Sequence, residues 1–183
     1  QGYSSAASDV YKRQIEDMVN FQNKFLKDKF GITHVRGIIG NSMGGFVALT
    51  CAVLYPDYVD FIISGASGYK VAGRNYILSK LVDEIISTDG DYDSGKNTSS
   101  LVRTLRLATQ AVYSFGISKE ALHKIPNSQL DVEFDEFGDE GLLDSIFDVK
   151  YCNDATLDYD IEKDLNKIRS KVLIIGINQD LSL

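Results

Sequence analysis

A Gly-Asn-Ser-Met-Gly segment, residues 40–44, restricts the possible folds of this chain more than any other part of its sequence. It lies between a short β-branched run, residues 35–40, and an apolar helical run, residues 46–54. A Gly-x-Ser-x-Gly segment between a strand and a helix is typical of a sharp turn that holds its serine strained and exposed, and we expect its glycines because the turn leaves no room for side chains. The pattern predicts that Ser42 is a nucleophile; a Gly-rich phosphate loop and a purely structural turn are the alternatives.

The same turn belongs to a predicted strand-helix-strand unit. Before it, apolar residues recur at helical spacing over residues 15–30, with charges on the opposite face and Gly31 at the stop position. After it, residues 59–65 and residues 171–176 are apolar runs that end in glycine. Strands that are joined through a helix pair in parallel with a right-handed connection. We therefore expect an α/β fold with a mostly parallel sheet.

Residues 69–158 lack strand-like alternation of comparable quality and predict a helical insertion into this α/β core. The core would consist of residues 15–68 and 159–183, and residues 1–14 would be a non-native or disordered lead. Within the insertion we expect helices over residues 76–86, 101–115 and 119–125, separated by joints at residues 89–97 and 137–141. We also expect an exposed loop at residues 131–140. After the insertion, residues 160–169 predict a polar helix.

Composition argues against several classes of function. The chain has 19 Lys and Arg against 26 Asp and Glu, a net charge of −7, and this field opposes binding to nucleic-acid phosphates. No apolar run approaches the roughly 20 residues that cross a bilayer. Cys51 and Cys152 lie outside any Cys/His cluster, so we predict no disulfide and no metal site, and a cytoplasmic location. Residues 1–14 lack the parts of a secretory signal, and we expect the chain to be a fragment.

A serine nucleophile needs a base and an acid. Asp180 follows the last predicted strand, at the sheet edge where the serine should lie, and is the expected acid; an ordinary loop-capping Asp is the alternative. His34 precedes the nucleophile strand at the wrong edge and His123 lies in the insertion, so we expect the base beyond Leu183; His123 as a substitute base is the alternative. The backbone N–H of Met43 is the expected oxyanion donor, with a second donor from an upstream loop.

Residues 15–67 resemble the core of the α/β-hydrolase superfamily, and most closely the homoserine O-acetyltransferase family. The resemblance covers the predicted helix, the turn and the strands, and it includes the segment VRGIIGNSMGGFVAL. Residues 89–95 loosely match a segment of that family's insertion, and Arg106 precedes Tyr113 by seven positions, as in the family. The resemblance implies that Arg106 binds a substrate carboxylate and that Tyr113 hydrogen-bonds the acceptor or the acyl carbonyl. A solvated helix arginine and a half-buried core tyrosine are the alternatives.

The resemblance also implies an activity, the transfer of an acetyl group to the hydroxyl of homoserine or a similar amino alcohol in methionine biosynthesis. The donor would be acetyl-CoA, a co-substrate rather than a resident cofactor, and a homodimer through the insertion helices is expected. A serine esterase shares the first half-reaction, so nothing around Ser42 separates the two. A non-catalytic relative that uses the pocket for binding is the third alternative.

Overall fold

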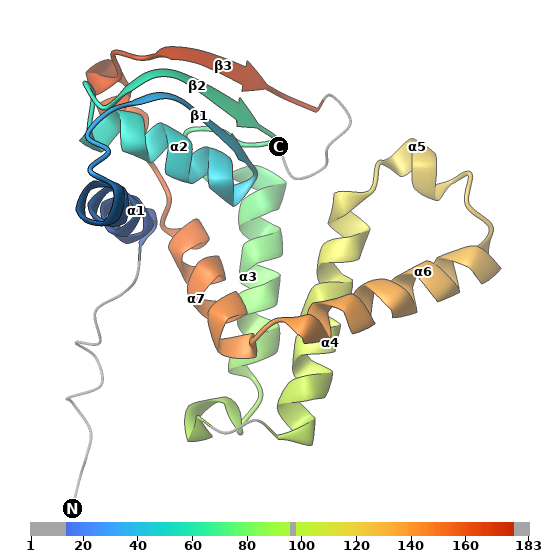
Figure 1. Ribbon diagram of the computed structural model, residues 1–183. Coiled ribbons are helices and arrows are strands. Elements are labelled where there is room, and N and C mark those ends of the chain that lie inside the picture. The colour runs from blue at the N-terminus through green and yellow to red at the C-terminus, as the bar shows by residue number, and fades with distance from the viewer. Residues whose placement is uncertain (1–13, 96–97, 178–183) are drawn as a thin grey trace, which may run out of the picture.

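The computed structural model describes residues 14–95 and 98–177. They form a parallel sheet with two helices on one of its faces, and a second group of helices that extends away from the sheet (Figure 1). In chain order the elements are α1 Ile15–Phe30, β1 Val35–Asn41, α2 Met43–Leu54, β2 Val59–Gly65, α3 Gly73–Ser87, η1 Tyr92–Ser94, α4 Ser99–Gly116, α5 Lys119–Leu122, α6 Asn127–Glu140, η2 Gly141–Leu143, α7 Ile146–Leu157, η3 Glu162–Lys167 and β3 Lys171–Ile175, where η denotes a 3-10 helix.

The three strands lie in the order β1-β2-β3, and both neighbouring pairs are parallel. Ile62 of β2 pairs with Ile38 on one side and with Val172 on the other. Parallel pairing places the carboxyl ends of the strands at one edge of the sheet, where Ser42 follows β1 and Ala66 follows β2. The predicted α/β fold with a parallel sheet is therefore confirmed.

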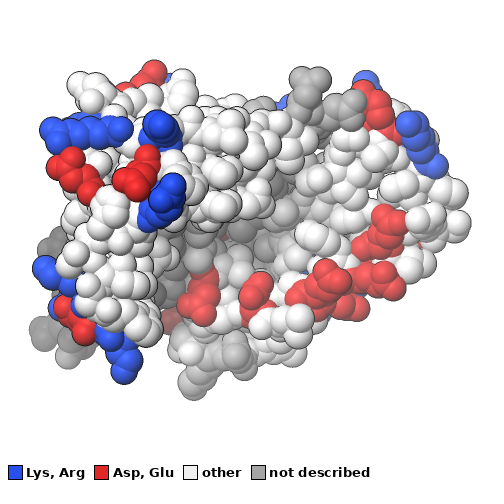
Figure 2. Space-filling model, turned by 45° about the horizontal axis from the view of Figure 1, so that its top comes forward, with Lys and Arg blue, Asp and Glu red and all other residues white. Residues whose placement is uncertain are grey.

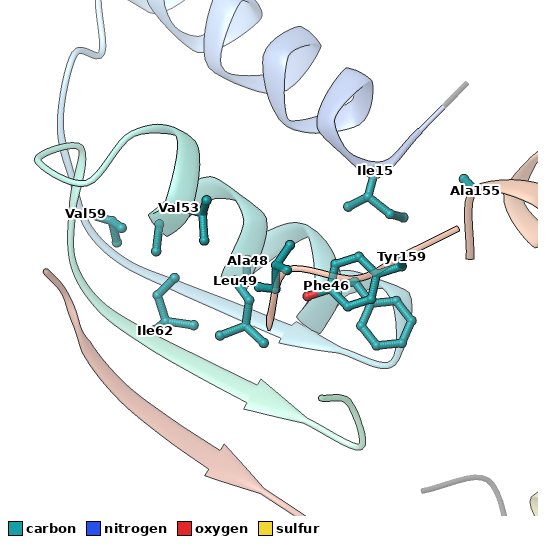
Figure 3. Close-up of a cluster of buried hydrophobic side chains, with 11 residues drawn as sticks. Ile15, Phe46, Ala48, Leu49, Val53, Val59, Ile62, Ala155 and Tyr159 are labelled. Carbon is teal, nitrogen blue, oxygen red and sulfur yellow. The ribbon is translucent and has the colours of Figure 1, made fainter. Parts of the chain in front are cut away.

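The main hydrophobic core lies between the sheet and helices α1 and α2 (Figure 3). Almost every residue of α2 is apolar, and most of the helix is buried; its Phe46 stacks on Tyr159 with the ring centroids 4.3 Å apart. The amphipathic helix α1 buries Ile15 and Val19 and ends at Gly31, whose φ of 68° confirms the predicted stop. All five residues of β3 are exposed, so the core covers the sheet from one side in the described part of the chain.

Five helices, α3 to α7, form a second group with a core of its own, and we call this group, residues 73–157, the insertion. Helix α3 packs against both α4 and α7, and α6 packs along α4 (Figure 1). The helical character expected for this part of the chain is confirmed, while its domain boundaries stay a prediction. The buried apolar residues of the insertion are Leu78, Val82, Ile86, Leu101, Leu105, Ala108 and Ile146.

Two parts of the secondary-structure prediction are wrong. Residues 131–140 and 137–141, expected to be a loop and a joint, belong to helix α6 and to the turn η2 that follows it. Gly138 marks close packing of two helices rather than a break, because a Cβ at this position would lie 2.8 Å from Cγ of Gln110 on α4. The polar helix expected at residues 160–169 is the shorter 3-10 helix η3.

The turn between β1 and α2 brings the backbones of the two elements into direct contact. A Cβ on Gly40 would lie 2.0 Å from the carbonyl oxygen of Gly44, and a Cβ on Gly45 would lie 1.9 Å from Oγ of Ser67. Ser67 is buried beneath α2, where its hydroxyl is hydrogen-bonded to that of Ser64. In contrast, a Cβ built on Gly44 would have no described atom within 4 Å apart from its chain neighbours and the backbone of its own helix. The expected crowding of the motif glycines is therefore present at Gly40, wrong at Gly44, and also present at Gly45, outside the motif.

An ion-pair network joins α7 to α3. Nζ of Lys150 on α7 lies 2.8 Å from a carboxylate oxygen of Asp83 on α3 and 2.7 Å from one of Asp154, and 13% of the Lys150 side chain is exposed. Burial opposes the charge of Lys150, but the hydrogen bonds to Asp154 and Asp83 outweigh it and raise the pKa of this lysine. Burial likewise opposes the charge of Asp83, and the hydrogen bonds from Lys150 and Lys80 outweigh it and lower the pKa of this carboxyl.

Gly45→Ala should lower the free energy of unfolding by about 1 to 3 kcal/mol, because the new methyl group overpacks the space beside Ser64 and Ser67. Gly44→Ala is the matched control: it lies in the same helix with open space around it, and alanine stabilises a helix over glycine by up to about 1 kcal/mol. Urea unfolding of the two variants measures the difference. Equal stability of the two variants would contradict the crowding at Gly45.

Lys150→Met should lower the free energy of unfolding by about 1 to 3 kcal/mol, because it leaves the partly buried carboxylate of Asp83 with the more exposed Lys80 as its remaining cation and with a long hydrogen bond from Ser87. Lys80→Met, the control, should cost less than about 1 kcal/mol.

The cost of Lys150→Met should also depend on pH. The folded-state pKa of Asp83 lies below its ordinary value of 3.8, so the stabilisation is complete above that pH and is lost as the pH falls through the folded-state pKa. Denaturant unfolding of the wild type and Lys150→Met at pH 7 and near pH ~2 tests this. An equal difference at both pH values would show that the charge of Asp83 contributes nothing.

Candidate active site

Ser42 lies between β1 and α2 with a backbone φ of 53° and ψ of −122°. A positive φ is unfavourable for a residue with a Cβ, and among the non-glycine residues that the structure describes only Ser42 and Ala66 adopt it. The N–H of Ser42 donates to the carbonyl of Gly65 at 2.9 Å, and the N–H of Ala66 donates to the carbonyl of Ile175 at 2.9 Å. Two strained residues thus follow adjacent strands at one edge of the sheet, and Ser42 is exposed there.

The first turn of α2 presents backbone N–H groups at the same place. The N–H groups of Gly45 and Phe46 donate to the carbonyl of Ser42 at 2.8 and 3.3 Å. The two preceding groups, those of Met43 and Gly44, are the ones left at the open end of the helix, where the helix dipole favours negative charge. This arrangement suits an oxyanion bound beside Ser42, and the role of the Met43 N–H stays a prediction.

A cavity of about 460 Å³ opens beside Ser42, between the carboxyl edge of the sheet and the insertion. Ser42 and Met43 form one wall, and helices α3, α4 and α7 form the other; Figure 1 shows the start of α2 beside α3. The insertion therefore forms one wall of the open space beside Ser42. The insertion residues that line this cavity are Leu78, Ser79, Val82, Val112, Asp144, Ser145, Asp148, Val149, Cys152, Asn153 and Thr156.

The cavity wall has an apolar part and a polar part. Leu78, Val82 and Val112 supply apolar surface from α3 and α4, whereas the lining residues at the start and along one face of α7 are mostly polar. The side-chain amide of Asn153 on α7 donates to the carbonyl of Ser79 on α3 at 2.8 Å, which fixes the spacing of these two helices. Such a mixed wall is typical of a site for a small organic substrate.

The structure does not bring Arg106 and Tyr113 to this cavity. Both lie in the interface between α4 and α6, where Arg106 pairs with Asp135 and Asp139, each at 2.8 Å. The hydroxyl of Tyr113 donates to Glu133 at 2.7 Å, and 8% of the residue is exposed. The hydrogen bonds to Asp139 and Asp135 raise the pKa of Arg106. These contacts are structural, and the substrate contacts expected of Arg106 and Tyr113 stay a prediction.

Neither histidine lies near Ser42. His34 precedes β1, at the opposite end of the strand from Ser42, and its ring nitrogens lie 3.1 Å from the carbonyl of Asp57 and 3.1 Å from a carboxylate oxygen of Asp60. His123 ends the short helix α5 and does not line the cavity. Asp180, the expected acid, lies outside the described residues.

The two cysteines differ in their surroundings. Cys51 is buried on α2, and burial raises the pKa of its thiol to about 11, so this thiol stays protonated and unreactive near neutral pH. Cys152 lies on α7 and lines the cavity.

In residues 14–95 and 98–177, no three His, Cys, Asp or Glu side chains lie close enough together to hold a metal ion. Within the same part of the chain no helix has the length and the apolar composition that crossing a bilayer requires.

Sequence reasoning missed the wall that α7 contributes. The lining positions 145, 148, 149, 152, 153 and 156 recur at helical spacing, which places them on one face of the helix. Their side chains mix apolar, hydroxyl, amide and acidic types, so no hydrophobic pattern reveals them. The three- and four-residue spacing becomes informative only when the position of Ser42 relative to this face is known.

The insertion also carries the net charge of the chain. Residues 73–157 contain 15 Asp and Glu against eight Lys and Arg, while the whole chain has a net charge of −7. On the face that Figure 2 shows, acidic side chains predominate over the insertion. The net charge of the insertion is therefore negative, and such a charge opposes polyanionic ligands.

Sequence comparison finds relatives over most of the chain. A protein family described as alpha/beta hydrolase fold matches residues 1–182. A probable acyltransferase from Methanothermobacter thermautotrophicus is 38% identical over 177 residues, which are 97% of this chain and 54% of that protein. A homoserine O-acetyltransferase from Nautilia profundicola is 35% identical over 89 residues, 49% of this chain and 24% of that protein. A homoserine O-succinyltransferase from Paraburkholderia phytofirmans is 35% identical over 81 residues, 44% of this chain and 21% of that protein.

Solved structures agree with this result. The acetyl esterase MekB matches with a TM-score of 0.83 at 21% identity, over 93% of this chain and 54% of its own. Homoserine O-acetyltransferase from Bacillus anthracis matches with a TM-score of 0.82 at 21% identity, over 96% of this chain and 53% of its own. The chain spans about half the length of these proteins, and at such identities the likeness shows the fold alone. Because the family match extends over nearly all of its sequence, the chain belongs to the α/β-hydrolase fold family.

Proposed function

We propose that this chain is the nucleophile-bearing part of an acyltransferase that moves an acetyl group from acetyl-CoA to the hydroxyl of homoserine or a similar amino alcohol. One observation carries the proposal: Ser42 is strained and exposed at the start of α2, beside a cavity whose other wall is formed by the insertion. The family match and the probable acyltransferase relative support it. The names of the other relatives include both acetyl and succinyl transfer, so they leave the acyl group open.

The proposed reaction has two half-reactions. Oγ of Ser42 attacks the thioester carbonyl, its proton passes to the base, the C–S bond breaks, and the CoA thiol leaves with a proton. The acceptor hydroxyl then attacks the acyl-enzyme, its proton passes to the base, and Ser42 regains a proton as its ester bond breaks. The N–H of Met43 would bind the negatively charged oxygen of each tetrahedral intermediate.

The base in this proposal is a histidine beyond Leu183, and Asp180 orients it. The positions of His34 and His123 support this assignment, because neither histidine lines the cavity. A cytoplasmic location and a homodimer through the insertion helices are also part of the proposal. Exposed apolar side chains on α4 and α6, such as Leu107 and Val132, each 54% exposed, support the dimer.

Hydrolysis of a neutral acetyl ester is the second candidate function. The observation that favours it is the negative charge of the insertion, because CoA carries several phosphate charges and an ester substrate need carry none. Both candidates form the same acyl-enzyme and differ in whether water or a bound alcohol accepts the acyl group. An assay of the full-length protein with acetyl-CoA and with a neutral acetyl ester, each with and without homoserine, separates them.

Ser42→Ala in the full-length protein should abolish the acyl-enzyme and lower turnover by several orders of magnitude, because the nucleophile works as a unit with its base and acid. Mass spectrometry after incubation with acetyl-CoA or an activated acetyl ester detects the adduct. Ser114→Ala, an exposed serine on α4, is the control and should behave as the wild type. An adduct on another residue, or full activity without an adduct, would remove Ser42 from this role.

Asp180→Asn should lower turnover by roughly 10⁴-fold with the fold intact, because the acid fixes the histidine tautomer and stabilises the imidazolium. Asp164→Asn is the control: it removes a surface carboxylate that pairs with Lys167 at 2.7 Å, and it should leave turnover unchanged. Steady-state kinetics and circular dichroism are the measurements. Near-normal turnover of Asp180→Asn would assign the acid to another carboxylate.

A further inference from the structure

We propose that the carboxylates of Asp144 and Asp148 make the cavity beside Ser42 selective for acyl groups that carry no negative charge. This inference rests on the proposed acyl transfer and specifies which acyl group Ser42 accepts. It separates an acetyl-like group from an acyl group that ends in a carboxylate.

The charge of the cavity lining carries the inference. Asp144 and Asp148 are the charged side chains among the described residues that line the cavity, and this lining contains no Lys, Arg or His. Asp144 precedes α7, and Asp148 lies in its first turn, on the face whose later residues also line the cavity. At this position the helix dipole favours a negative charge.

Two cations on the helices that form this wall are paired with other carboxylates and do not line the cavity. Lys150, two positions after Asp148 and therefore on another side of α7, is held by Asp83 and Asp154. Arg106 is held by Asp135 and Asp139 in the α4–α6 interface. Neither Asp144 nor Asp148 has a side-chain hydrogen bond or ion pair in the described part of the chain. Their charges are therefore not neutralised by any described neighbour.

An acyl group with a terminal carboxylate would place a third negative charge in this cavity. Two like charges about 8 Å apart at a partly wetted protein surface repel each other enough to change a rate constant by up to about tenfold. Salt screens such a repulsion, because the Debye length at physiological ionic strength is itself about 8 Å. A neutral acyl group meets no such repulsion and can use the apolar wall formed by Leu78, Val82 and Val112.

The test compares two activated esters of nearly equal size, p-nitrophenyl hydrogen succinate, which carries one negative charge, and p-nitrophenyl methyl succinate, which is neutral. The full-length protein releases p-nitrophenol as Ser42 is acylated, and kcat/KM for each ester is measured at low ionic strength. The wild type should prefer the neutral ester by about tenfold more than the intrinsic reactivities of the two esters explain. This preference should shrink in 0.5 M salt, where the Debye length is only about 4 Å.

Asp148→Asn and Asp144→Asn should each raise the ratio of kcat/KM for the anionic ester to that for the neutral ester by about three- to tenfold. Asp131→Asn, on the exposed side of α6, removes the same charge away from the cavity and should leave the ratio at its wild-type value. Circular dichroism checks that the three variants fold alike, and Asp→Asn preserves side-chain volume.

Different failures have different meanings. Equal use of the two esters by the wild type, or an unchanged ratio in both Asp144→Asn and Asp148→Asn, would overturn the charge selectivity and leave the proposed acyl transfer standing. Release of p-nitrophenol that is the same in Ser42→Ala as in the wild type would overturn the proposed function, and the selectivity with it.

Discussion

The close approach of strand β1 to helix α2 is the constraint on which the rest of this structure depends. A side chain on Gly40 would meet the carbonyl of Gly44, and one on Gly45 would meet the buried hydroxyls of Ser64 and Ser67. Because the chain reverses from strand to helix within this space, the residue between the two elements must adopt an unfavourable backbone conformation, and Ser42 does so. The same reversal sets the N-terminus of α2 beside the serine. Strain, exposure and local electrostatic potential at Ser42 therefore share one geometric cause.

The sheet edge alone does not define the site, because its other wall comes from the insertion. The position of that wall depends on α7, which together with the two residues before it carries most of the polar lining and is held to α3 by Lys150 and by the amide of Asn153. Polar contacts of this kind are sensitive to geometry, since a partly buried charge without its partner is costly. The core that surrounds α2 is instead fixed by apolar burial over the sheet, as Figure 3 shows. Ser42 thus lies beside a helix held by apolar packing, and the opposite wall of its cavity is held in place by polar contacts.

The parts that could be predicted from the sequence are those in which local pattern and tertiary environment agree. The apolar runs of β1, β2 and β3 pair in one parallel sheet as predicted, and α1 forms the predicted helix and buries Ile15 and Val19. The prediction of a joint fails at Gly138. The sequence alone does not distinguish a glycine that lets two helices pack closely from a glycine that ends a helix. Prediction from the sequence also fails for α7, whose residues contact the core on one side and the cavity on the other, so neither face is uniformly apolar. The ion pairs of Arg106 with Asp135 and Asp139 could not be predicted either, because both carboxylates belong to a segment that the sequence predicts to be a loop.

The distribution of glycine around Ser42 separates a functional turn from a structural one. If the turn served only to connect β1 to α2, glycine would be the favoured residue at the position with φ of 53°, because glycine adopts this conformation without steric cost. The chain has glycine at positions 40, 44 and 45, and one of them, Gly44, has open space around it and a backbone that does not require glycine. The strained position itself is occupied by serine, whose hydroxyl is exposed at the cavity. A residue that is costly for the backbone at this point is most simply explained by its side-chain chemistry, since neither packing nor turn geometry calls for it.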